Sequence, residues 1–352
     1  MSRSSAFEFD ILSRLEALRG RIGSLPSDQA IATEKITGFE DHRIGMTTSG
    51  DLCYVLRIPD CTGRVNPPIR LQRISVDPCI ACEIVDQHEA RTERSITLIR
   101  THQLSDSEIV ALDGLMQASL ALISTGAATI DSSIEGIIES FQRLRSPGTR
   151  SLIGLFGELV FIRAAKSSIA ALKSWRSRTD STFDFWEGSL RVEVKSTVLT
   201  LREHSFSAEQ CAVANDEIGL VASILLTETG NGYSTNDLVA EIDGQLQSET
   251  APLEERAAQR AKLYSTVIET IEGGLETANN TRFDLDSAVA SIRLFDVSKI
   301  PRLLAPFPTG ISNVRFTSRL DEETSIKSVE TIPIADSARL LLPRLTFPDQ
   351  RD

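Results

Sequence analysis

The sequence predicts an α/β protein whose N-terminal domain is rich in strands. Three observations support this fold class. Residues 36–104 contain short β-branched or alternating runs broken by Gly and Pro, which is typical of strands. From Ser105 onward the apolar residues recur at helical spacing. Residues 182–198 then return to strand patterns on both sides of a turn at Glu187–Gly188–Ser189.

The N-terminal domain begins with a short amphipathic helix over Phe9–Leu18. Four strand-like runs follow, with breaks at Gly63, at Pro67–Pro68 and at Asp77–Pro78. The runs are Cys53–Ile58, Ile69–Val76, Ile80–Val85 and Ser95–Arg100.

Three helices are expected next. Ser105 and Glu108 form a capping box that starts the first helix. The second helix spans Ser132–Leu144 and ends at Ser146–Pro147–Gly148. The third helix, Arg150–Lys166, is apolar on most of its surface, which predicts a buried helix.

In the rest of the chain, segments with the apolar spacing of strands alternate with segments that have the apolar spacing of helices. The hairpin has arms at Thr182–Trp186 and Leu190–Val198, and further strands are expected at Glu217–Leu226 and 311–317. An acidic helix covers Leu253–Glu272. We therefore expect a β-rich domain over 1–104, an α/β core over 105–245 and a mixed acidic C-terminal region over 246–352.

Length and charge limit the function. At about 150 residues per domain, 352 residues suggest two or three domains. The net charge of −12 argues against non-specific duplex binding if it is evenly spread. It is not evenly spread, because residues 142–180 hold eight basic and two acidic residues and so carry +6. This segment is either a phosphate-contacting surface or a set of solvated helix faces.

The cysteines and the N-terminus suggest a compartment. The first 20 residues lack a continuous apolar stretch, and no run reaches the roughly 20 apolar residues of a membrane span. Five cysteines without regular spacing are typical of a reduced, cytoplasmic protein. Buried free thiols are the favoured interpretation, and a zinc site stays open for Cys53, Cys61, Cys79 and Cys82.

The hairpin carries the pattern D-x8-E-x-K, formed by Asp184, Glu193 and Lys195. Glu193 and Lys195 are two residues apart in a strand and so project from one face. Asp184 is expected across from Arg191 or Val192, diagonal to Glu193. Two carboxylates so placed suit a hard cation such as Mg²⁺, with the carbonyl of Val194 as a further ligand. The alternative is a surface ion pair between Glu193 and Lys195.

Glu158 is the single acid of the third helix and also has two interpretations. It supports the metal from beside the sheet, or it forms an ion pair with Arg163 or another Arg.

The order of several motifs resembles an uncharacterised bacterial family of PD-(D/E)XK motif proteins, within the restriction-endonuclease-like nuclease superfamily. The core of the resemblance spans Ile153–Gln210. The resemblance implies a restriction-endonuclease-like core, in which helices flank a mixed sheet. It also implies that Asp184 and Glu193 hold Mg²⁺, that Lys195 is the catalytic lysine and that Glu158 is the acid of the preceding helix. Thr182–Phe183 replaces the Pro often found before the metal-binding Asp. The motifs are Gly154–Leu159, Trp175, Phe183–Phe185, Val192–Thr197 and His204-x-x-Ser207-x-x-Gln210.

Other residues near the hairpin are candidates for phosphate contacts. Ser207 and Gln210 fit a capping box, and Gln210 together with His204 also lies just past the catalytic strand. Arg150, Arg176 and Arg178 belong to the basic segment before the hairpin.

These observations predict a Mg²⁺-dependent DNA endonuclease, with Mn²⁺ as a substitute metal. Family resemblance suggests bacterial restriction or anti-phage defence, a homodimer and partner proteins of a defence system. The alternative is a non-catalytic DNA-binding or assembly subunit that keeps the nuclease fold.

Overall fold

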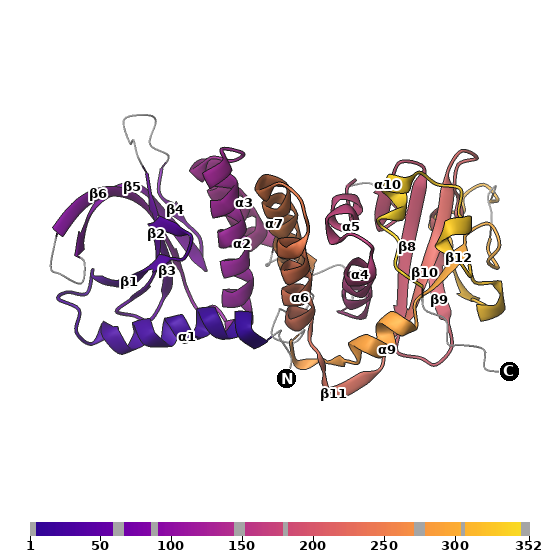
Figure 1. Cartoon of the computed structure of the whole chain (residues 1–352), viewed down its shortest axis with the longest axis horizontal. Coiled ribbons are helices and arrows are strands. Elements are labelled where there is room, and N and C mark those ends of the chain that lie inside the picture. The colour runs from indigo at the N-terminus through magenta and orange to yellow at the C-terminus, as the bar shows by residue number, and fades with distance from the viewer. Residues whose placement is uncertain are drawn as a thin grey trace.

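In the computed structural model, a layer of helices separates two β-sheets (Figure 1). The N-terminal sheet and α1 form one lobe, and the sheet that contains β8 and β10 forms the other. The structure describes residues 5–58, 67–85, 91–143, 152–178, 182–270, 279–303 and 307–345.

The N-terminal lobe is an antiparallel six-stranded sheet in the order β1-β2-β3-β6-β5-β4, with α1 (Ser5–Ile22) packed against β1 and β2. Its strands confirm the predicted β-rich domain. They are β1 (Ile31–Ile36), β2 (Phe39–Thr47), β3 (Leu52–Arg57), β4 (Ile69–Arg70), β5 (Ile74–Val85) and β6 (Arg91–Thr101).

The predicted break at Asp77–Pro78 was wrong. Strand β5 continues through it, and the irregularity is a bulge between Asp77 and Ile80. A bulge accommodates a Pro without ending the strand, because the extra residues need not pair with the partner strand. Cys79 lies in this bulge with φ +53°.

Cys79 is disulfide-bonded, which differs from the fully reduced protein that we expected. Cys53 and Cys82 are free, and burial raises the pKa of the Cys53 thiol to about 12. Cys61 lies outside the described residues. Because Cys79 is no thiolate, the structure does not support a four-thiolate zinc site.

The middle layer contains six helices, of which α5 and α6 have no counterpart in the sequence prediction. The capping box of Ser105 and Glu108 at the start of α2 is confirmed. α2 is also the one helix in the described part of the chain that is long and apolar enough to cross a membrane. It packs against α7, however, and 56% of its apolar 18-residue stretch is buried. The helices are α2 (Asp106–Thr125), α3 (Ile130–Arg143), α4 (Leu152–Ala164), α5 (Ser168–Ser174), α6 (Thr235–Ser248) and α7 (Leu253–Thr270).

The second lobe is built on a mixed sheet in the order β12-β10-β8-β7. β8 and β10 are parallel, and the other pairs are antiparallel. This arrangement confirms the predicted α/β fold with a mixed sheet. The strands are β7 (Phe185–Glu187), β8 (Leu190–Thr197), β10 (Ile218–Leu225) and β12 (Arg293–Asp296).

The remaining elements lie around this sheet. A separate two-stranded ribbon pairs β9 (Glu203–Ser207) with β13 (Arg315–Arg319). β12, β13 and α7 all follow residue 245, so the C-terminal region supplies parts of both the sheet and the helical layer; the domain boundaries stay a prediction. The short elements are β11 (Glu228–Tyr233), α9 (Leu285–Ala290), α10 (Asp336–Arg339) and three 3₁₀ turns at Glu209–Cys211, Glu322–Thr324 and Val329–Thr331.

A close helix–sheet contact positions the buried acid of α4. A Cβ atom added at Gly157 would lie 2.5 Å from Ser196 Oγ, so α4 can approach β8 only because residue 157 is Gly. The Ser196 hydroxyl also donates a hydrogen bond to the carbonyl of Ile153 at 2.7 Å. This contact places Glu158, the next residue of α4, beside the sheet.

A polar contact joins the N-terminal lobe to the helical layer, and others hold the helices of that layer together. The Tyr54 hydroxyl donates to Asp113 Oδ1 at 3.0 Å, and the Tyr264 hydroxyl donates to Asp243 Oδ2 at 3.1 Å. Arg260 pairs with the same Asp243. The ring of Tyr264 lies directly against Gly114 of α2, in space that a Cβ atom would occupy.

We predict that Gly114→Ala lowers the free energy of unfolding by about 1–3 kcal/mol, because the new methyl group overlaps the Tyr264 ring. Gly136→Ala in α3 is the control, since nothing lies within 4 Å of its added Cβ. It should stabilise the helix by about 0.5–1 kcal/mol. Urea unfolding of both variants measures the difference, and equal stability would contradict the packing described.

Candidate active site

Asp184 lies immediately before strand β7, which begins at Phe185 and pairs Phe185 with Val192. We had expected Asp184 itself to face Arg191 or Val192, so the register was wrong. Because β7 is so short, no residue of it pairs with Val194. The Val194 N–H instead donates to Asp184 Oδ2 at 2.9 Å, and Asp184 is only 4% exposed. The carbonyl of a strand residue points to the same side as its N–H, so the Val194 carbonyl faces the same edge of the sheet.

Glu193 is buried, with 4% of its surface exposed. Its Oε1 lies 2.8 Å from Lys195 Nζ and accepts a hydrogen bond from Gln210 Nε2, whereas Oε2 is buried without a hydrogen-bond partner. Burial raises the pKa of the Glu193 carboxyl well above its usual range, nearby Asp184 raises it further, and Lys195 opposes them. Glu193 and Lys195 are therefore paired, but not as the surface ion pair of the alternative interpretation.

Gln210 holds the two charged groups of β8 together. Its Oε1 accepts from Lys195 Nζ at 3.3 Å, and its Nε2 donates to Glu193. The expected capping box is also present, since the Ser207 N–H donates to Gln210 Oε1 at 3.0 Å and the Gln210 N–H donates to Ser207 Oγ at 3.3 Å. One side chain thus closes the turn after β9 and contacts Glu193 and Lys195.

Glu158 is the centre of a buried ion pair. Trp175 Nε1 donates to its Oε2 at 2.6 Å, and the Arg176 guanidinium contacts the same carboxylate at 2.9 Å. Arg163, the other partner that we considered, pairs with Glu241 instead. The ion-pair interpretation of Glu158 therefore describes the structure, with Arg176 as the partner.

This ion pair also positions Asp184. The Arg176 N–H donates to the Asp184 carbonyl at 2.7 Å, and Trp175 forms a β-bridge with Phe185. Arg176 adopts φ +44°, a conformation that costs free energy in residues other than Gly. Glu158 thus fixes the segment that lies beside the metal-binding candidate. Sequence patterns could not find the role of Trp175, because its partner is 17 residues away in another element.

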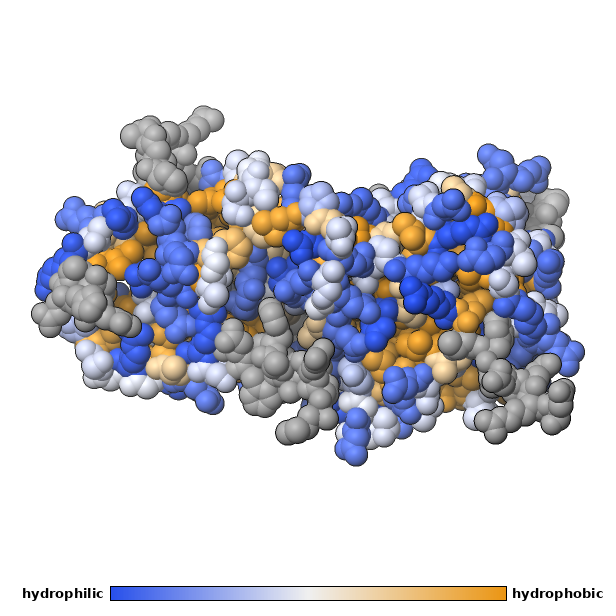
Figure 2. Space-filling model, in the orientation of Figure 1, coloured by the Kyte–Doolittle hydropathy of each residue, from blue (hydrophilic) through white to orange (hydrophobic). Residues whose placement is uncertain are grey.

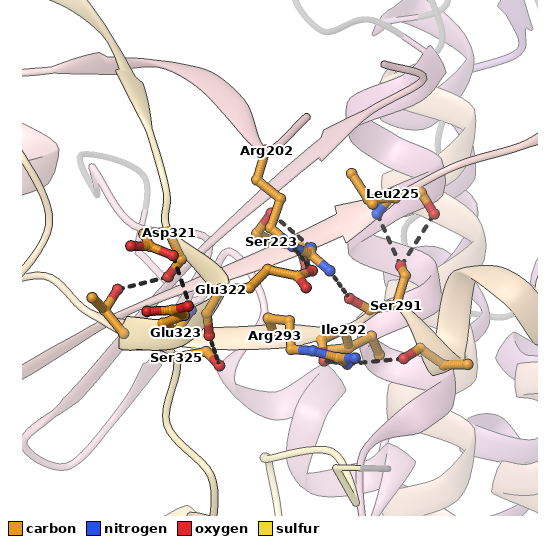
Figure 3. A network of polar contacts seen from close by, with 12 residues as sticks. Arg202, Ser223, Leu225, Ser291, Ile292, Arg293, Asp321, Glu322, Glu323 and Ser325 are labelled. Atoms are coloured by element: carbon orange, nitrogen blue, oxygen red, sulfur yellow. Dashed lines mark hydrogen bonds and ion pairs between the residues drawn. The ribbon is translucent and has the colours of Figure 1, made fainter. Parts of the chain in front are cut away.

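His204 is buried and does not face solvent. It is 5% exposed, and its Nε2 lies 2.8 Å from Ser223 Oγ. That hydroxyl oxygen already accepts a hydrogen bond from buried Arg202 (Figure 3), so its proton is directed to a neutral His204. Burial, together with the nearby charges of Lys195 and Arg202, lowers the pKa of His204 to about 4. His204 is thus a packing residue rather than a phosphate contact.

Of the five basic side chains that the structure describes in the segment before the hairpin, four are paired with acids, and three of those acids lie outside the segment. Arg145 and Arg150 lie outside the described residues, as does the side chain of Arg143. Exposed Arg178 lies over the ring of Trp186, with its Cζ 4.7 Å from the centroid, and is available for phosphate contact. The segment's ion pairs are Arg163–Glu241, Lys166–Glu330, Lys173–Glu255 and Arg176–Glu158.

The residues at the sheet edge fit a divalent cation. Asp184 and Glu193 are buried close enough to raise the pKa of Glu193, and Glu193 Oε2 lacks a hydrogen-bond partner. A cation would supply positive charge that balances the two carboxylates, and it would bind Glu193 Oε2 as a ligand. Among the described residues, no group of three His, Cys, Asp or Glu side chains is placed to hold a metal, so a cation here would have two carboxylates and the Val194 carbonyl as its protein ligands.

Comparison with known proteins agrees with this architecture. A family model described as "Putative PD-(D/E)XK family member (DUF4420)" matches residues 84–321. The chain belongs to this family. No curated protein and no solved structure matches it. The family match covers Glu158, Asp184, Glu193, Lys195 and Gln210 and indicates a nuclease-like fold.

We expect Arg176→Met to destabilise the protein by about 3 kcal/mol, because it leaves the Glu158 carboxylate buried without its counter-ion. Arg178→Met removes a neighbouring exposed guanidinium and should cost less than about 1 kcal/mol. Chemical unfolding at neutral pH compares the two variants. A cost for Arg176→Met no larger than that for Arg178→Met would contradict the role assigned to the ion pair.

His204 should make stability depend on pH. Its folded-state pKa of about 4 lies below the unfolded value of 6.5, so protonation favours the unfolded chain. The stabilisation is complete above pH 6.5 and is lost as the pH falls toward 4. Between pH 7 and pH 5, wild type should lose about 2 kcal/mol more than His204→Asn, whose side chain does not titrate. Parallel pH profiles for the two proteins would refute this assignment.

Proposed function

We propose that this protein is a Mg²⁺-dependent endonuclease that hydrolyses DNA phosphodiester bonds. The observation that carries the proposal is the pair of buried carboxyl groups of Asp184 and Glu193. Lys195 lies beside them, two residues after Glu193 in β8. Buried groups of like charge are costly, and proteins retain such arrangements mainly where they bind a ligand or a metal. Membership of a PD-(D/E)XK family supports the same chemistry.

Each residue has a defined part in the proposed reaction. Asp184, Glu193 and the Val194 carbonyl hold the cation, which when bound stabilises negative charge on the phosphate. Lys195 Nζ, now shared between Glu193 and Gln210, orients the attacking water and the scissile phosphate. Glu158 acts through Arg176 and Trp175 by keeping Asp184 in place.

The biological setting is part of the proposal. The resemblance to restriction-endonuclease-like proteins supports a cytoplasmic role in bacterial restriction or anti-phage defence, as a homodimer that acts with other defence proteins. Mn²⁺ should replace Mg²⁺, because both are hard cations that carboxylate oxygens bind.

A second candidate is a non-catalytic DNA-binding or assembly subunit. It is favoured by the fact that Glu158 is already neutralised by Arg176, which leaves only two carboxylates for a metal among the described residues. The two candidates differ in one property: a binding subunit keeps its function when Asp184 is replaced by its neutral isostere.

We predict that the purified protein cleaves DNA in the presence of Mg²⁺ or Mn²⁺, and that Asp184→Asn and Lys195→Ala each reduce the rate at least about 100-fold. Cleavage is measured separately on duplex, single-stranded and modified DNA, so that the assay also identifies the preferred form of the substrate. Asp184→Asn removes a charge that the cation requires, whereas Lys195→Ala removes the group that orients the nucleophile.

The control variants change the same residue types outside the site. Asp286→Asn alters an exposed acid in α9, and Lys299→Ala alters a 70%-exposed lysine after β12. Both should cleave at the wild-type rate. Cleavage that survives in the Asp184 and Lys195 variants would rule out the nuclease assignment, and metal-independent DNA binding without cleavage would favour the second candidate.

A further inference from the structure

The two-stranded ribbon of β9 and β13 lies directly beside the candidate site. Its inner face packs on the catalytic strand, since Lys195 Nζ lies 5.3 Å from the centroid of the Phe206 ring. Phe206 in turn stacks on Phe316 of β13, with ring centroids 6.0 Å apart. Gln210, which contacts both Glu193 and Lys195, follows β9 after one short turn.

The outer face of the ribbon is polar and positively charged. Side chains alternate along each strand, and those facing away from the sheet are exposed or half-buried. On β13 they are Arg315, Thr317 and Arg319, and on β9 they are Glu203, Ser205 and Ser207. Two guanidinium groups and three hydroxyl groups on one face are typical of surfaces that contact phosphates, and Glu203 is the single acid among them.

Arg315 and Arg319 differ from the other cations near the site. Within the described part of the chain, neither guanidinium has a hydrogen-bond or ion-pair partner, whereas four cations of the basic segment are paired with acids. Alternate residues of an antiparallel strand are about 7 Å apart, so the two guanidinium groups start about 14 Å apart on one face. Their charge is directed to solvent and is available to a polyanion.

An apolar loop precedes the ribbon. It joins β8 to β9 and contains Val198, Leu199 and Leu201, which are 43%, 58% and 45% exposed. These are three of the eight large apolar side chains that are exposed in the described part of the chain. Figure 2 shows mostly hydrophilic residues on the visible face, with apolar residues between them over both lobes.

The loop is held firmly at its base. Arg202, 4% exposed, ends the loop and donates to the Ser223 carbonyl at 2.9 Å and to the Ser291 carbonyl at 2.6 Å (Figure 3). Its Nε also donates to Glu322 at 2.7 Å. The Leu226 N–H donates to the Thr197 carbonyl at 2.8 Å on the other side of the loop. The exposed leucines therefore project from a fixed base.

We propose that the outer face of the β9–β13 ribbon and the 198–201 loop form the surface that grips duplex DNA next to the scissile phosphate. Arg315 and Arg319 contact backbone phosphates, with Ser205 and Thr317 as hydroxyl donors, and Leu199 and Leu201 contact base or sugar edges in a groove. Apolar wedges and Arg contacts occur together in proteins that bind DNA through a groove. This inference names the substrate contacts of the proposed nuclease and so rests on the proposed function.

The observations favour DNA over a protein partner. In this loop the exposed apolar area comes only from Val198, Leu199 and Leu201, within four consecutive residues, whereas a stable protein interface buries about 800 Å² on each partner. The unpaired guanidinium groups lie on the strand that pairs with β9, in direct continuation of the loop. A ribbon of two strands also fits the width of the DNA major groove.

The test measures binding of a fluorescein-labelled duplex by anisotropy in EDTA, so that cleavage is not required. Arg315→Ala/Arg319→Ala should weaken binding and reduce the slope of log affinity against log salt by about 1.8, because two phosphate contacts are lost. Leu199→Ser/Leu201→Ser should weaken binding severalfold and leave that slope unchanged, because an apolar contact releases no counter-ions.

A matched control replaces two exposed arginines of the N-terminal lobe, Arg19→Ala/Arg94→Ala, which changes the net charge equally. Its affinity and salt slope should equal those of the wild type. Equal losses in both arginine pairs, or no loss in Arg315→Ala/Arg319→Ala, would overturn the proposal. A leucine variant that binds DNA normally but changes the oligomer mass would reassign the loop to a protein interface.

The outcomes separate this inference from the proposed function. If the ribbon variants lose DNA binding while no variant or wild type shows cleavage, the ribbon is a DNA-binding surface on a non-catalytic protein. If cleavage depends on Asp184 but the ribbon variants bind and cleave DNA as wild type does, the nuclease assignment stands and the ribbon inference fails.

Discussion

Three carboxyl groups are buried close together at one edge of the mixed sheet, and most of the second lobe is arranged around their neutralisation. Burying an unpaired charge costs several kcal/mol, so each group needs its own partners. Glu158 has Trp175 and Arg176, Asp184 has the Val194 N–H, and Glu193 has Lys195 and Gln210. The carboxyl groups and their partners come from α4, from the end of α5, from the hairpin and from the turn after β9. Electrostatic neutralisation thus fixes where four separate elements meet.

The neutralisation is incomplete at one atom. Glu193 Oε2 is buried without a hydrogen-bond partner, and the carboxyl holds its proton more tightly than an exposed Glu. Proteins that satisfy nearly all buried polar groups usually leave exceptions where a ligand completes the site. A divalent cation bound by both carboxylates would offset the repulsion between Glu193 and Asp184 and would give Glu193 Oε2 a contact, which is the physical basis for proposing a metal at this edge of the sheet.

Local sequence patterns predicted the elements but not their contacts. The capping box of α2, the apolar helix around Glu158, the hairpin and the parallel strand β10 follow from spacing and periodicity. The position of Asp184 does not, because the first arm begins to pair only at Phe185, which faces Val192, and not at Thr182 as predicted. The charge sum of residues 142–180 was misleading for a similar reason. Arg163 and Lys173 are neutralised by Glu241 and Glu255, residues that are distant in sequence and adjacent only after folding.

The N-terminal lobe is connected to the site through α2 and α7. Tyr264 of α7 packs on Gly114 of α2. Lys262, two residues earlier and therefore on roughly the opposite side of α7, donates to the Leu172 carbonyl at 2.6 Å and to the Lys173 carbonyl at 3.1 Å. Those carbonyls end α5, and burial in this position lowers the pKa of Lys262 to about 8. α5 leads directly into Trp175 and Arg176, which hold Asp184 through Glu158. The position of α7 between α2 and α5 therefore helps to set where the carboxylates of the site lie, although the residues that bear them are all in the other half of the molecule.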